Sequence, residues 1–234
     1  MQDSGQSYYH RVLETLPGQK CPACREVDDS IDEYLRRTLY GRVTDRRFRA
    51  AFDAAGGLCH SHARRLAAFS DGLAISLLYE TPLRESLERP RPKERLRSWF
   101  RRRAPGEYTY RGFKVTGNCP ACDRAKEFER HYLTIVARYW DQQALQDAFE
   151  QSPGLCLPHL RRVRRLGKPP EWFESFHREK VERLQAAIHR FVEYSNATSW
   201  DRPRLAREEQ LKWKEVLRFL YGENVLPEQE SPPD

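Results

Sequence analysis

Residues 21–24 read Cys-Pro-Ala-Cys, and residues 57–65 read Gly-Leu-Cys-His-Ser-His-Ala-Arg-Arg. Both stretches recur: residues 119–122 again read Cys-Pro-Ala-Cys, and residues 154–162 read Gly-Leu-Cys-Leu-Pro-His-Leu-Arg-Arg. The offsets are 98 and 97 residues, so the two copies keep the same order and nearly the same spacing. An internal repeat of this kind predicts two equivalent structural units within one chain.

All six cysteines of the chain lie inside this repeat, and each copy adds a histidine three residues after its last cysteine. Each copy therefore reads Cys-x2-Cys, then 34 or 33 residues, then Cys-x2-His. Two short-spaced ligand pairs are the usual donor set of a closed tetrahedral zinc site. We predict two Zn²⁺ ions per chain, each held within one copy. The expected ligands are Cys21, Cys24, Cys59 and His62 for one ion, and Cys119, Cys122, Cys156 and His159 for the other.

The spacing leaves alternatives open. An exchanged arrangement, with Cys21 and Cys24 beside Cys156 and His159, satisfies it equally, although the parallel order of the repeat favours pairing within a copy. An iron–sulfur cluster also takes cysteine ligands and accepts histidine. A redox dithiol or a set of disulfides would leave the recurring histidines without a role.

The other histidines lack ligand-like spacing. His60 follows Cys59, but its counterpart in the second copy is Leu157. We expect a solvent-facing or hydrogen-bonded side chain there, and ordinary helix residues at His10, His131, His177 and His189.

Apolar residues inside each copy recur with the helical period. Ile31, Tyr34, Leu35 and Leu39 share one face of a predicted helix, and residues 128–139 repeat the pattern. The period continues from His62 to Leu78, which predicts one helix across Gly72. Alternation over residues 108–115 predicts a small hairpin.

These signals predict an all-α protein of two pseudo-repeat helical units, each tied by a Cys3His metal site, with an Arg-rich connector. We expect an N-terminal helix and the first repeat in residues 1–88, the connector in 89–118 and the second repeat in 119–200. A closing helix follows in 201–222, and a disordered tail in 223–234.

The connector carries the charge of the molecule. Residues 89–114 hold ten basic and two acidic side chains, a charge of +8 against +7 for the whole chain. Arginines interleaved with aromatic residues suit phosphate neutralisation and base stacking. We therefore expect this segment to contact nucleic acid or an acidic protein surface, with a solvated linker as the alternative. The expected contact residues are Arg95, Arg97, Trp99, Arg101, Arg102, Arg103, Arg111 and Lys114.

Composition narrows the class of protein further. The chain of 234 residues is 32% charged and 39% hydrophobic. No stretch approaches the ~18 unbroken apolar residues of a membrane span, and the N-terminus lacks the basic and apolar regions of a signal peptide. We expect a soluble, cytoplasmic protein.

No sequence motif for catalysis is present: the chain lacks a phosphate-binding glycine loop, a nucleophile elbow and a metalloprotease HExxH. Four protein ligands per metal also leave no open position for water. The sequence thus favours a non-enzymatic zinc protein, an interaction module for nucleic acid or protein. The alternative is an iron–sulfur or thiol-based redox or metal sensor.

The duplicated CPxC…GLCxxH pattern, residues 71–74 (Asp-Gly-Leu-Ala) and the closing helix with Trp213 resemble an uncharacterised bacterial family of unknown function. The resemblance spans most of residues 20–222 and includes all eight motif residues. It implies the paired metal sites and no particular activity.

Overall fold

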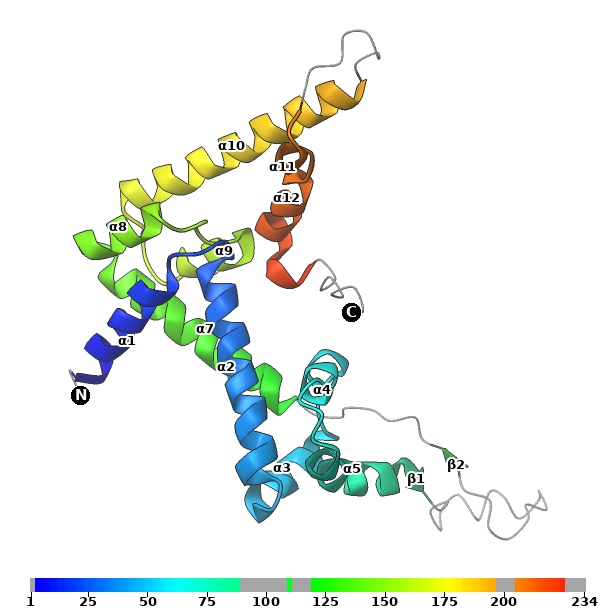
Figure 1. Cartoon of the computed structure of the whole chain (residues 1–234). Coiled ribbons are helices and arrows are strands. Elements are labelled where there is room, and N and C mark those ends of the chain that lie inside the picture. The colour runs from blue at the N-terminus through cyan, green and yellow to red at the C-terminus, as the bar shows by residue number, and fades with distance from the viewer. Residues whose placement is uncertain (1–2, 89–108, 111–118, 197–204, 226–234) are drawn as a thin grey trace, which may run out of the picture. The chain divides into compact units, whose positions relative to one another are not determined.

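The computed structural model describes residues 3–88, 109–110, 119–196 and 205–225 (Figure 1). Most of these residues lie in helices, so the predicted all-α class is confirmed. Two short strands, β1 (Leu87–Glu88) and β2 (Thr109–Tyr110), form one antiparallel pair. Thr109 and Tyr110 are the only described residues of the predicted hairpin over residues 108–115. They pair with β1, which lies outside the predicted hairpin.

The chain divides into two compact units that cut across the sequence copies. Unit 1 comprises Met1–Asp28 and Phe128–Asp234, and unit 2 comprises Asp29–Glu127. Two long helices, α2 (Pro22–Arg37) and α7 (Pro120–Tyr139), therefore each begin in one unit and end in the other.

Unit 1 holds the larger core. Besides parts of α2 and α7 it contains α1 (Asp3–Thr15), α8 (Gln143–Glu150), α9 (Leu157–Val163), α10 (Glu171–Asn196), α11 (Arg207–Gln210), α12 (Lys212–Tyr221) and the 3-10 turn η2 (Glu223–Val225). Tyr132 and Val136 lie one turn apart on α7 and are fully buried. Phe149 of α8 meets Phe173 of α10 edge-on, with ring centroids 5.3 Å apart.

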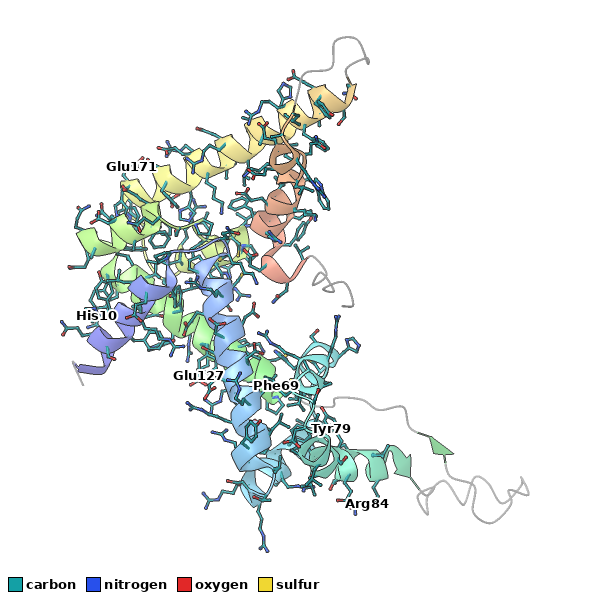
Figure 2. All side chains as sticks on the ribbon, viewed as in Figure 1. His10, Phe69, Tyr79, Arg84, Glu127 and Glu171 are labelled. Carbon is teal, nitrogen blue, oxygen red and sulfur yellow. The ribbon has the colours of Figure 1, made fainter. Side chains whose placement is uncertain are left out.

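Unit 2 contains the end of α2 and three further helices. These are α3 (Arg46–Ala55), α4 (His60–Ala67) and α5 (Gly72–Ser86), and a π-helical turn η1 (Thr38–Arg42) extends α2. Ile31 and Leu35 of α2 are buried, as their spacing predicts. Tyr79 lies on α5 (Figure 2). Its ring meets the Phe52 ring of α3 edge-on, with ring centroids 5.4 Å apart.

The single helix predicted from His62 to Leu78 is wrong, because α4 and α5 are separate. Ser70 adopts a left-handed conformation with φ of 56°, which ends the helical path. Asp71 then accepts a hydrogen bond from the Ala74 N–H at 3.0 Å and starts α5. Leu66 of α4 and Leu78 of α5 are buried, but Leu73, which continued the apolar period just after the break, is 74% exposed.

Parts of the sequence interpretation fall outside the described residues. All eight predicted polyanion contacts, from Arg95 to Lys114, lie in residues 89–108 or 111–118, as does most of the connector. Residues 226–234 of the predicted disordered tail also lie outside, whereas its first three residues form the 3-10 turn η2. None of the described helices combines the length and apolar character that crossing a membrane would need.

Candidate metal centres

The eight predicted ligands gather into two groups, but the exchanged pairing is the one observed. Site 1 consists of Cys21, Cys24, Cys156 and His159, and site 2 consists of Cys59, His62, Cys119 and Cys122. Within each group the four donor atoms lie within 4.8 Å of one another. The expectation that each copy holds its own ion is therefore wrong: each site takes its Cys-x2-Cys pair from one copy and its Cys-x2-His pair from the other.

Helix length explains the exchange. The 20 residues of α7 span about 30 Å at 1.5 Å per residue, whereas the 8 residues of α8 that follow span only about 12 Å. Helix α8 alone is therefore too short to carry the Cys-x2-His pair back to the start of α7. In the first copy α2 has 16 residues and is extended by the 5 residues of η1, against 10 residues in α3. Each Cys-x2-His pair consequently stays in the unit where its own long helix ends, and it meets the other copy's Cys-x2-Cys pair there.

Four of the cysteines open helices. The carbonyls of Cys21, Cys119, Cys59 and Cys156 each accept a hydrogen bond from the N–H four residues on, at 2.8–3.1 Å. The second ligand of each pair then lies three residues later, on the first helical turn. Each site thus receives two helix N-termini, whose partial positive charge stabilises thiolates. Gly57 and Gly154, with φ of 89° and 70°, turn the chain two residues before Cys59 and Cys156, which accounts for the glycine in the motif.

The donor separations in site 1 match the edges of a tetrahedron. Metal–sulfur bonds of about 2.3 Å and a metal–nitrogen bond of about 2.1 Å put two sulfurs about 3.8 Å apart, and sulfur and nitrogen about 3.6 Å apart. Cys24 Sγ lies 3.8 Å from Cys156 Sγ. His159 Nδ1 lies 3.5 Å from Cys21 Sγ, 3.5 Å from Cys24 Sγ and 3.1 Å from Cys156 Sγ.

Site 2 has the same geometry. Cys59 Sγ and Cys122 Sγ are 3.6 Å apart, and His62 Nδ1 lies 3.2–3.6 Å from all three sulfurs. All six thiols are free, and these sulfur separations far exceed the ~2.05 Å of a disulfide. Each group can therefore hold one four-coordinate metal ion.

The electrostatics of both groups also call for a cation. In site 2, burial and the neighbouring thiols of Cys59 and Cys119 raise the pKa of Cys122 to about 12. In site 1, burial opposes a positive charge on His159, but hydrogen bonds to Cys156, Cys21 and Glu129 outweigh it and raise the pKa of the imidazole to about 12. A metal ion would displace that proton and neutralise the crowded thiolates, so its binding must release protons.

Site 1 has a second layer of polar contacts that the sequence did not reveal. His159 Nε2 donates to Glu129 Oε1 at 2.7 Å, which leaves Nδ1 to face the sulfurs. Glu129 also pairs with Arg162. Burial on its own would raise the pKa of Glu129, but the hydrogen bond from His159 and the charge of Arg162 hold it below its ordinary value. Such a carboxylate fixes the tautomer and orientation of a metal-binding imidazole.

Unit 2 repeats part of this layer. Arg65 lies three residues after His62, as Arg162 lies three residues after His159, and it binds Asp32 through two hydrogen bonds of 2.5 and 2.9 Å. Asp32 belongs to α2 and Glu129 to α7, so in each unit the carboxylate comes from the long helix that ends there.

His177 supports the loop that carries Cys156, although its spacing predicted an ordinary helix residue. Its buried ring accepts a hydrogen bond from the Leu155 N–H at 3.1 Å through Nε2 and donates from Nδ1 to the Phe173 carbonyl at 2.8 Å. The ring lies so close to Gly154 that a Cβ there would meet Nε2 at 3.2 Å. His60, by contrast, is exposed, in agreement with its missing counterpart.

The C-terminal segment covers site 1. Glu223 of η2 accepts a hydrogen bond from the Cys21 N–H at 2.8 Å, and the Cys156 N–H donates to Cys21 Sγ at 3.3 Å. Gly222, with φ of 97°, ends α12 so close to Cys24 that a Cβ would lie 3.7 Å from its sulfur. Three of the four ligands of site 1 are buried, whereas in site 2 only Cys119 is.

The sequence comparisons place the chain in a family. Residues 15–194, which include all eight ligands, match a family described as a family of unknown function (DUF6062). A protein of Caldicellulosiruptor sp. (strain Rt8B.4), named "Uncharacterized 23.9 kDa protein in xynA 3'region", is 25% identical over 155 residues, covering 65% of this chain and 69% of the relative. No solved structure matches the chain. The resemblance predicted from the motifs is confirmed, and the chain belongs to the DUF6062 family.

Proposed function

We propose that this chain is a non-enzymatic zinc protein that binds two Zn²⁺ ions and presents a basic surface to nucleic acid or an acidic protein. The observation that carries the metal assignment is the convergence of three sulfurs and one imidazole nitrogen, within 4.8 Å of one another, in each unit. A Cys3His set at tetrahedral separations is the donor set that structural zinc prefers.

The same distances argue against a multi-iron cluster. Two sulfurs that share one metal ion at bonds of about 2.3 Å cannot be more than about 4.6 Å apart. The observed sulfur separations of 3.6 and 3.8 Å fall within that limit. The sulfurs of cysteines that bind different iron atoms of one cluster can lie further apart than this limit. The observed separations therefore favour a single metal ion in each group.

The proposed ions have a structural role. Each is fully coordinated by protein, so no position remains for a water nucleophile. The ion of site 1 joins the helix starts at Cys21 and Cys156, and the ion of site 2 joins those at Cys119 and Cys59. Metal binding of this type contributes on the order of 10 kcal/mol to folding. A reducing compartment such as the bacterial cytoplasm would keep the six thiols available.

The interaction role rests on charge. Residues 89–114 carry +8, which favours weak and salt-sensitive binding to polyanions. The test is a gel shift with DNA and RNA over a series of salt concentrations. The triple variant Arg101→Ala, Arg102→Ala, Arg103→Ala should weaken binding and flatten its salt dependence. An unchanged affinity and salt dependence would reject the connector as the contact surface.

The metal assignment is tested by elemental analysis and absorbance of the native protein. We expect two zinc ions per chain and no visible colour. Stoichiometric iron with a brown colour, in protein purified without oxygen, would replace this proposal with the sensor alternative.

A further inference from the structure

A cavity of about 370 Å³ lies in unit 1, between α10, the start of α12 and the loop that leads to Cys156. In this unit α12 packs against α10 (Figure 1). The volume falls in the range of ~300–1,000 Å³ that is typical of small-molecule sites. The metal centres do not use this cavity, which we call the α10–α12 pocket.

The lining of the pocket is strongly basic. It contains four cationic side chains and one carboxylate, namely Lys180, Arg183, Arg190, Lys212 and Glu215. Lys212 pairs with Glu215 at 2.7 Å. The two arginines make only loose pairs with exposed or half-exposed carboxylates, at 3.7 Å to Glu179 and 3.4 Å to Glu209. Exposed surface pairs of this kind contribute little to stability, so a better anion can displace them.

Lys180 brings its charge to the buried end of the pocket. Its Nζ donates to the Pro153 carbonyl and lies 5.0 Å from the centre of the Phe219 ring. Burial lowers the pKa of this ammonium, although the charges of Cys21 and Glu215 oppose the shift. Among the described residues no carboxylate lies within ion-pair distance of Lys180. A buried ammonium whose contacts are uncharged is costly and is stabilised by an anion.

We propose that the α10–α12 pocket binds a small phosphate-bearing molecule. Arginine guanidinium groups match two phosphate oxygens at once, and a multiply charged anion balances the excess of three positive charges better than a single carboxylate does. Leu184 and Ala187 stand between the arginines on α10 and offer an apolar wall to the organic part of the ligand.

The test uses the full metal-loaded chain with pyrophosphate as the probe, measured by titration calorimetry and by the thermal midpoint. We expect saturable binding and a higher midpoint with pyrophosphate. The double variant Arg183→Gln, Arg190→Gln should weaken binding at least tenfold, since it removes charge-assisted hydrogen bonds, which are stronger than neutral ones. The matched control is Arg178→Gln, also on α10, because Arg178 pairs with Glu171 and does not line the pocket.

Metal content is measured in every variant, so that loss of a metal ion is not mistaken for loss of the pocket. Absence of saturable binding by the wild type overturns the proposal, as does equal weakening by Arg178→Gln. Binding that survives the double variant and is lost in the Arg101→Ala, Arg102→Ala, Arg103→Ala variant would assign the anion to the connector and also overturn it.

Discussion

Replacing Glu129 with glutamine should weaken metal binding at site 1 about tenfold and leave site 2 unchanged. His159 Nε2 lies 2.7 Å from Glu129 Oε1 in the wild type. The amide oxygen of glutamine can still accept this hydrogen bond, so the orientation of the imidazole survives. The charge does not. A charge-assisted hydrogen bond contributes about 1.5–3 kcal/mol and a neutral one about 0.5–1.5, a difference of about 1–1.5 kcal/mol. Tenfold is also the lower end of the loss typical when such a supporting carboxylate is changed.

The assay is competition for Zn²⁺ between the protein and a chelating dye. The two sites are told apart by repeating the titration in Cys122→Ser, which lacks a ligand of site 2. Glu127→Gln is the matched control, because Glu127 lies on the same helix (Figure 2), is exposed and pairs with Arg124 at 2.7 Å. Unchanged affinity at site 1 in Glu129→Gln, or equal losses at both sites, would refute the reasoning.

Three further outcomes follow from the geometry. Cys24→Ser should lower the metal content to about one ion per chain and remove hydrogen-exchange protection from α1 and α9 of unit 1 but not from α3 and α5; loosening of residues 29–88 instead would contradict it. His177, whose pKa burial lowers to about 4, should stay neutral, with its proton on Nδ1, at pH 5 in imidazole ¹⁵N spectra; a ring that becomes charged near pH 6.5 would contradict this. The pKa of His177 in the folded chain lies below its unfolded value of ~6.5. The neutral ring therefore stabilises the fold by about 3 kcal/mol above pH 6.5, and this stabilisation is lost as the pH falls toward 4. A chelator should remove the ion of the more exposed site 2 first, seen as two kinetic phases of metal release, and a single phase would count against the difference in burial.

The repeat was sufficient to predict the ligands and the helical class. Six cysteines and two histidines at matching spacing are typical of paired metal sites, and the helical period around Ile31 and Leu35 identifies the buried face of α2. The partners of each ligand pair could not be read from spacing, because both arrangements contain the same short motifs. Helix length favours the exchanged arrangement, and the long periodic run over residues 128–139, followed by a short helix at Leu145 and Phe149, contains that signal.

The supporting residues were beyond sequence reasoning for a different reason. Glu129 is one of many carboxylates on helix faces, and only its position beside His159 in the folded chain gives it a role. His177 lies among apolar helix residues, and its function depends on the Leu155 N–H, 22 positions away in the chain. Local patterns do not encode such long-range contacts.

The exchanged pairing is tested most directly by replacing the native metal with ¹¹³Cd and recording ¹H–¹¹³Cd correlation spectra. We predict two cadmium signals. One should correlate with Cys21, Cys24, Cys156 and His159, and the other with Cys59, His62, Cys119 and Cys122. A single cadmium signal that correlates with both Cys21 and Cys59 would contradict the account.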